Sequence, residues 1–250
     1  MKNTILLIGA FILSCQDQPK KKIIEEYSVK TEFSESNSPD WIYLFDGTTF
    51  KGWHQYNKTQ MSPAWSIEEG AMMFTPDGEK YGGGHNIVTD NEYSNFELSL
   101  EWKISEGGNS GIFWGVKEDQ KYFEAYQTGP EVQVLDNERH PDAKANPKYH
   151  QAGALYDLVQ PSQDVCNPAE SWNHVILMVN HVSNKGSIKL NDTEIATIPV
   201  NGEPWKKLVS GSKFDNETFV DFGKFKTGRI GLQDHGDVVY YRNIKIREIE

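Results

Sequence analysis

Hydrophobic and polar residues alternate along most of the chain from Trp41 onward. The clearest run covers residues 96–104, where every even position is apolar and the odd positions are Glu, Ser, Glu and Lys. Five apolar residues at a period of two are typical of a half-buried strand, because successive side chains of a strand point to opposite faces. The pattern therefore predicts a strand over 96–104.

Similar runs recur through the rest of the chain, separated by turn-forming pairs such as Glu69-Gly70. In the last run, Val238, Tyr240, Ile244 and Ile246 are expected on one face, opposite Lys245 and Arg247. The other expected strands are 65–67, 71–74, 110–116, 131–135, 152–158, 173–179, 188–190, 194–200 and 229–232.

Only residues 203–210 have a helical pattern, and no linker interrupts 41–250. Many short strands with one short helix predict an all-β fold, in which two antiparallel sheets pack as a single sandwich domain. A polar loop over 136–151 is long for a compact domain, and such loops are usually functional or mobile.

The first forty residues have a different composition. Lys2 precedes an apolar run over 5–13, which predicts an export signal over 1–14, since a bilayer-spanning helix needs about 20 residues. Cys15 follows Ile-Leu-Ser, which resembles a bacterial lipobox, so we expect Cys15 to be lipidated and to anchor the exported protein to the cell envelope. The alternative is an ordinary signal with an unmodified cysteine. The polar residues 15–40 are expected to form a flexible tether.

Charge and cysteine content exclude several classes of function. The 250 residues include 36 acidic and 25 basic side chains, a net charge of −11, which argues against a nucleic-acid partner. Two cysteines are too few for a disulfide scaffold or a multi-thiolate zinc site. A neutral or cationic small molecule remains the expected ligand.

Six segments, taken in order, resemble one family: Leu44-Phe45-Asp46-Gly47 with Gly52-Trp53, 107–113, 128–137, 152–157, Trp172-Asn173, and 231–236 leading into 242–246. Their order and spacing are similar to the 3-keto-disaccharide hydrolase domain family over the whole of 41–250. The resemblance implies a concanavalin-A-like jelly roll, a sugar substrate and a secreted bacterial protein.

The family name implies a specific chemistry. A sugar oxidised to a ketone at C3 has an acidic hydrogen at C2, and the enolate formed by its removal can expel the oxygen on C1. Water then adds back, so that elimination and hydration together amount to hydrolysis. Such a site needs a base near C2, an electrophile for the C3 oxyanion and a proton donor for the leaving oxygen. A divalent metal ion could act as the electrophile.

Glu131 is the first candidate for the base or a metal ligand. Glu131 and Gln133 alternate with Val132 and Val134, so they project from one face of a strand. The alternative is a solvated strand face, and in either case we expect Glu131→Gln to change stability little. Asp136 has the opposite parity and joins the same site only if the strand ends or bulges at Leu135.

His235 lies between two strands, in Gln233-Asp234-His235-Gly236, where it could move protons or bind a metal ion. The alternative is a histidine that bonds to the turn backbone. Asn109 lies at a strand start, and Tyr156 and Asp157 are expected at a strand end, where they could stack on a sugar and bind its hydroxyls.

The predicted site thus has catalytic or metal-binding candidates Glu131, His235 and Asp136, with substrate contacts from Asn109, Gln133, Tyr156, Asp157 and Gln233. The seven histidines show no short metal-binding spacing. We expect an enzyme that cleaves glycosides. The rivals are a non-catalytic carbohydrate-binding module of the same fold and a calcium-stabilised scaffold domain.

Overall fold

The computed structural model of the chain describes residues 40–76, 84–145 and 148–250, which belong to one compact unit. The predicted signal over 1–14, Cys15 and the tether up to residue 39 lie outside the described residues. Among the residues that are described, no helix has the length and apolar character needed to cross a bilayer.

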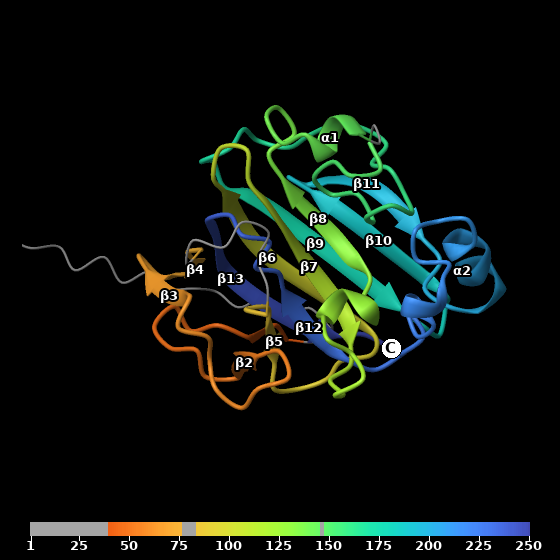
Figure 1. Cartoon of the computed structure of the whole chain (residues 1–250), viewed down its shortest axis with the longest axis horizontal. Coiled ribbons are helices and arrows are strands. Elements are labelled where there is room, and N and C mark those ends of the chain that lie inside the picture. The colour runs from red at the N-terminus through yellow and green to blue at the C-terminus, as the bar shows by residue number, and fades with distance from the viewer. Residues whose placement is uncertain (1–39, 77–83, 146–147) are drawn as a thin grey trace, which may run out of the picture. The chain divides into compact units, whose positions relative to one another are not determined.

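Two antiparallel sheets form the fold, as the alternating pattern predicted (Figure 1). Within the described residues, the larger sheet has eight strands in the order β11-β10-β9-β6-β13-β4-β3, with β1 paired to β13. Its strands are β1 (Ile42–Tyr43), β3 (Trp65–Glu68), β4 (Ala71–Phe74), β6 (Phe96–Ile104), β9 (Asn173–Asn180), β10 (Lys185–Leu190), β11 (Thr193–Ile198) and β13 (Val239–Glu248).

The smaller sheet has the order β2-β5-β12-β7-β8. Its strands are β2 (Trp53–Gln55), β5 (Ile87–Thr89), β7 (Asn109–Val116), β8 (Glu131–Leu135) and β12 (Arg229–Leu232). The predicted all-β jelly-roll sandwich is confirmed.

Helices are few and short. The predicted helix over 203–210 is α2 (Gly202–Val209), and the polar loop after β8 contains a single turn, α1 (Asp142–Ala145). Two 3₁₀ turns, Ala125–Gln127 and Glu217–Phe219, lie in loops near the smaller sheet's β8 edge.

The hydrophobic core lies between the two sheets. Leu98 and Leu100 of β6 face it from the larger sheet, and Val132 and Val134 of β8 face it from the smaller one. Burial of each such side chain contributes about 1.5–3 kcal/mol, so these positions fix which face of each strand turns inward. On β8 this choice leaves Glu131 and Gln133 on the outer face of the smaller sheet.

That outer face is also partly covered. Phe113 of β7, the cross-strand partner of Glu131, packs there in a second apolar cluster with Val88 and Val116. Buried Tyr122 and Ala125, from the loop after β7, close over this cluster. Glu131 is therefore placed beside a packed patch and beneath loops, rather than on an open sheet surface.

Two strand predictions are wrong. Residues 152–158 form turns, and the left-handed backbone of Asp157, with φ of 61°, interrupts the segment. In β13 the register shifts between Arg242 and Lys245, where Asn243 also has a positive φ of 53°. This bulge reverses the parity, so that Val239 and Tyr241, not Val238 and Tyr240, share the buried face with Ile244 and Ile246.

Candidate functional site

A pocket of about 360 Å³ opens on the outer face of the smaller sheet. Its floor comes from β7, β8 and the end of β12, and its walls come from loops. The lining residues are Asn109, Tyr126, Glu131, Gln133, Tyr156, Lys213, Phe214, Phe219, Gln233 and His235. Six of the eight residues predicted to form a site are among them.

Glu131 is the buried acid of this pocket, with 7% of its surface exposed. Its carboxyl group lies over the backbone of Gly111 on the neighbouring strand, where a side chain would otherwise stand. Burial raises the pKa of Glu131 to about 8, because water no longer solvates the charged form. Lys213 opposes this shift and Asp142 adds to it.

Three amide side chains, those of Asn109, Gln133 and Gln233, line the pocket together with Glu131. The Gln133 Nε2 donates to the Asn109 Oδ1 at 2.7 Å, which fixes both side chains on the pocket floor. The buried Oε1 atoms of Gln133 and Gln233 accept no hydrogen bond from the described residues. An unsatisfied buried acceptor costs about 1–3 kcal/mol, so hydroxyl donors of a ligand would stabilise this arrangement.

Tyr156 reaches the pocket although its segment is not a strand. The segment follows the free edge of β8: the Gly153 N–H donates to the Gln133 carbonyl at 2.8 Å, and the Tyr156 N–H donates to the Glu131 carbonyl at 3.0 Å. The Tyr156 hydroxyl donates to Asp142 at 3.1 Å, and its ring stacks on His150 at 4.4 Å between centroids. The loop therefore holds the Tyr156 ring rigidly beside Glu131.

Asp157 lies behind this wall and does not line the pocket. Its carboxylate is 3.1 Å from the His150 Nε2 and accepts from the Lys213 N–H at 2.9 Å. The His150 Nδ1 is in turn 2.9 Å from Asp142. The expectation that Asp157 contacts the sugar is thus replaced by a supporting role, in which it fixes the loop that carries Lys213.

Lys213 was not predicted from the sequence, because it follows α2 in an irregular loop with no motif around it. Its ammonium lies 3.9 Å from the centroid of the Tyr156 ring. Desolvation of the ammonium group lowers the Lys213 pKa, although more than a third of the whole residue is exposed. The negative charges of Glu131, Asp157 and Asp142 partly offset this shift. Lys213 gives the pocket a cation next to its buried acid.

His235 lines the pocket, as expected from its place after β12. Burial lowers the pKa of His235, so its imidazole is neutral near pH 7 and can accept a proton. Its ring also contacts that of His140, with 6.4 Å between the centroids.

Asp136 is not brought to this pocket. Strand β8 ends at Leu135, but the Asp136 carboxylate then turns into the following loop and accepts the Gly107 N–H at 2.7 Å and the Glu138 N–H at 3.0 Å. Although burial opposes the change, these backbone bonds lower the Asp136 pKa, with further help from Arg139. Its oxygens are used to hold the loop, so Asp136 is removed from the candidate base and ligand set.

The three side chains considered as possible metal ligands are not all brought together. Of its three candidates, only Glu131 and His235 share the pocket. Within the part of the chain that the structure describes, no group of three or more His, Cys, Asp or Glu side chains is arranged to hold a metal ion. We derive no step through a metal.

The chain that forms this pocket can be placed in a family. Residues 40–247 match the 3-keto-alpha-glucoside-1,2-lyase-like domain. The chain belongs to this family. It is 32% identical to a 3-keto-disaccharide hydrolase of Bacteroides thetaiotaomicron, over 94% of this chain and 90% of that protein.

Solved structures agree with this membership. A candidate glycosyl hydrolase from Parabacteroides distasonis is 30% identical and superposes with a TM-score of 0.75, covering 84% of this chain and 94% of that one. A second one from the same organism, 24% identical, has a TM-score of 0.65, over 84% of this chain and 100% of that one, and shares the fold. Family membership supports a carbohydrate-active function of the glycosidase type.

Proposed function

We propose that this protein cleaves 3-keto-glycosides, disaccharides among them, by elimination across C1 and C2 followed by hydration. The observation that carries the proposal is a single buried carboxyl group, Glu131, whose pKa is raised to about 8 on the floor of a polar pocket. A base removes a carbon-bound proton most effectively when its pKa is near the working pH. The name of the Bacteroides relative points to the same substrate class.

An ordinary glycosidase would need a second carboxyl group in the pocket, because acid and nucleophile or base flank the scissile bond. Glu131 is the one acidic residue among the lining residues that the structure describes. Asp142 is a carboxyl group outside the lining that acts electrostatically on Glu131, but its oxygens are engaged by His150 and the Tyr156 hydroxyl. This arrangement favours chemistry that begins with one base.

In the first half of the proposed reaction, the Glu131 carboxylate takes the C2 proton, and the electron pair of the C–H bond forms an enolate with the negative charge on O3. Collapse of the enolate breaks the bond from C1 to the leaving oxygen and forms a C1–C2 double bond. The leaving oxygen takes the proton from Glu131, which becomes a carboxylate again. Two products result, a free alcohol or sugar and an unsaturated ketone.

In the second half, water adds to C1 while neutral His235 accepts its proton. The His235 imidazolium then passes this water-derived proton to the Glu131 carboxylate, which delivers it to C2 of the enolate that has re-formed. The net change is hydrolysis, and both side chains return to their starting states. The Lys213 ammonium is the cation of the pocket, and we assign to it the stabilisation of the O3 charge in both halves.

The rival function is a non-catalytic carbohydrate-binding module. The aromatic walls of the pocket, formed by Tyr126, Tyr156, Phe214 and Phe219, would suit such a module. The buried Glu131 counts against it, because burying a carboxyl group destabilises its charged form, and a surface that only stacks on sugars does not need it.

Turnover separates these functions. The domain 41–250 should be incubated with a 3-keto-disaccharide and with the same disaccharide unoxidised, with and without chelator, and compared with the Glu131→Gln variant. We expect cleavage of the oxidised substrate alone, lowered about 10²–10⁴-fold by the substitution. Cleavage of the unoxidised sugar, or binding of either sugar without cleavage, would contradict the proposal.

We further propose that the protein is exported and anchored to the bacterial cell envelope through lipid on Cys15. The support is the sequence alone: a basic residue, a short apolar run and a cysteine directly after Ile-Leu-Ser. An acidic, polar segment between this cysteine and β1 would let the sugar-binding domain stand away from the membrane.

A further inference from the structure

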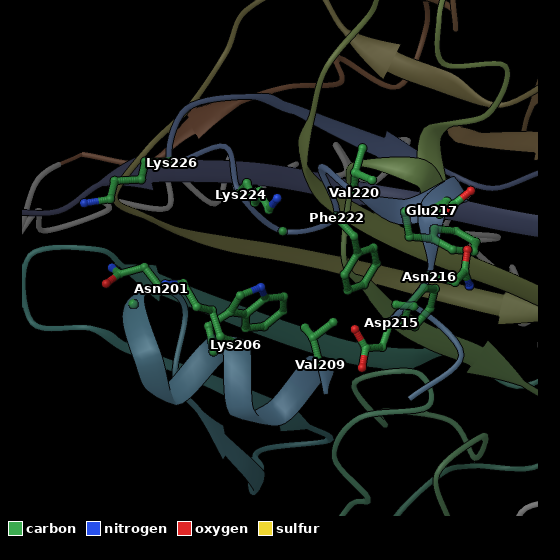
Figure 2. Close-up of a pocket in the computed structure, with 15 residues that line it drawn as sticks. Asn201, Lys206, Val209, Asp215, Asn216, Glu217, Val220, Phe222, Lys224 and Lys226 are labelled. Carbon is green, nitrogen blue, oxygen red and sulfur yellow. The ribbon is translucent and has the colours of Figure 1, made fainter. Parts of the chain in front are cut away.

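A second, larger hollow of about 690 Å³ lies between α2 and the segment that follows it. Figure 2 shows Val209 on α2 and Phe222 on the opposite segment pointing toward one another across it. Trp205 and Phe222 are buried in its wall and Val220 stands exposed at the side, with 54% of its surface accessible. The wall of the hollow is therefore mostly apolar, and its buried Trp205 Nε1–H has no acceptor among the described residues.

This hollow adjoins the pocket of Glu131. Phe214 and Phe219 line both, so the two share an aromatic wall. The rings of Phe214 and Phe219 are 5.1 Å apart between centroids, and Phe214 stacks on Phe222 at 3.9 Å. The rings of Phe214, Phe219 and Phe222 thus form one aromatic cluster that borders both cavities.

We propose that this hollow binds the leaving group of the substrate, and that the leaving group it fits is a flat aromatic aglycone. The inference rests on the proposed function, because that function places the bond to the leaving oxygen in the pocket of Glu131. A glycoside whose sugar ring occupies that pocket must direct its aglycone outward, and the shared wall of Phe214 and Phe219 provides an apolar path.

The chemistry of the walls selects this occupant over a second sugar. A sugar carries a hydroxyl group on most of its carbon atoms, and each needs a polar partner when it is buried. Trp205 and Phe222 are buried in the lining and Val209 is half-buried. The polar lining side chains are exposed, apart from a half-buried asparagine: Lys206, Asp215, Asn216, Glu217, Lys224, Lys226 and, half-buried, Asn201. Aromatic rings gain from offset or edge contacts with Phe and Trp as well as from apolar burial.

The test compares two substrates in matched variants: the 4-methylumbelliferyl 3-keto-glucoside and a 3-keto-disaccharide. Val220→Asp places a charge at the hollow without touching the pocket of Glu131, and Val182→Asp is its control, since Val182 is 80% exposed and lines neither cavity. We expect Val220→Asp to lower kcat/KM for the aryl substrate about 10-fold, mainly through KM, with less than about a 2-fold change for the disaccharide. Val182→Asp should change neither.

A binding measurement keeps this inference separate from the proposed reaction. Calorimetric titration with free 4-methylumbelliferone should show binding to the wild type and to Glu131→Gln, and about 10-fold weaker binding to Val220→Asp. If no 3-keto-glycoside is turned over but this pattern holds, the reaction is wrong and the aromatic site stands. The aromatic site would be overturned if Val220→Asp lowered kcat/KM equally for both substrates or for the disaccharide alone. Unchanged binding of 4-methylumbelliferone to Val220→Asp would also overturn it.

Discussion

The carboxyl group of Glu131 occupies the space above Gly111 in which the Cβ of any other residue would stand. A Cβ built on Gly111 would lie 2.6 Å from the Glu131 Cδ, closer than two such carbon atoms can approach. Gly111 pairs with Gln133, two positions along from the pair formed by Phe113 and Glu131, so this space exists only because β7 has a glycine there. The missing side chain at Gly111 thus makes room for the buried carboxyl group of Glu131.

Gly111→Ala is therefore expected to displace the acid. The added methyl group would overlap Glu131, and overpacking of this kind costs about 1–3 kcal/mol of stability. We also expect kcat to fall by at least 10-fold, measured together with the melting temperature. Gly231→Ala is a milder comparison, because a Cβ there would lie 3.2 Å from Phe113, which a shift of a few tenths of an ångström relieves. Wild-type activity and stability in Gly111→Ala would show that Glu131 does not need this space.

Glu131→Gln should reveal the energetic cost of burying the acid. The folded-state pKa of about 8 exceeds the ordinary value of 4.5, so between these pH values the folded protein binds more protons than the unfolded chain. The free energy of unfolding of the wild type should then fall as pH rises from about 4.5 to 8, and the neutral glutamine lacks this fall. The variant should gain melting temperature relative to wild type across that range.

The same experiment can contradict the burial. A difference in melting temperature that stays constant between pH 4.5 and 8.5 would mean that Glu131 titrates normally. The sequence pattern alone led to the expectation of a small stability change, because it treated the outer face of β8 as solvated. The loops that close over this face, and that carry Tyr156 and Lys213, are the reason that the structure predicts a larger change.

Lys213 is expected to control the pH dependence of the reaction. Its positive charge lowers the pKa of Glu131, so Lys213→Met should raise that pKa and move the rise of kcat/KM to a higher pH. Loss of the oxyanion partner should also lower kcat about 10²–10³-fold. Lys213→Arg keeps the charge and should retain the position of the pH profile. A lower rate with an unshifted profile in Lys213→Met would remove Lys213 from the electrostatics of Glu131.

The sequence predicted the two sheets well, because alternation directly reports which side chains face the core. The bounds of β8 and β12 and the shared face of Glu131 and Gln133 follow from it. The alternating pattern no longer identifies the buried side chains where a bulge or a turn interrupts the strand. The bulge at Asn243 reverses the faces of β13, and the turn at Asp157 converts an expected strand into a loop along the edge of β8.

The site was predicted only in part for a related reason. Residues on strands, such as Gln133, could be placed from parity, whereas Lys213 and Phe214 come from a loop whose position depends on tertiary contacts. The sequence also could not decide whether Asp136 joins the site of Glu131. Whether a residue after a strand end faces the sheet or the loop depends on which backbone N–H groups are within reach, and for Asp136 those are Gly107 and Glu138.

The proposed lipid anchor predicts a change in cellular location. Cys15→Ser removes the thiol to which lipid would be attached, so the protein should move from the membrane fraction to the soluble fraction. Fractionation of cells that express either form, followed by detection of the domain, measures this. Cys166→Ser is the matched control, because Cys166 lies within the folded domain and forms no disulfide there. Membrane association that survives Cys15→Ser would contradict the anchor.

Transfer of hydrogen at C2 tests the proposed reaction most directly. The domain should convert a 3-keto-disaccharide in D₂O, and the 3-keto-sugar product should be examined by NMR and mass spectrometry against an incubation without enzyme. If Glu131 removes the C2 proton and a water-derived proton replaces it, the product carries one deuterium on C2. Glu131→Gln should incorporate deuterium no faster than the incubation without enzyme. A cleaved product that keeps its original hydrogen at C2 would show that the bond to C1 breaks by direct displacement, without the enolate.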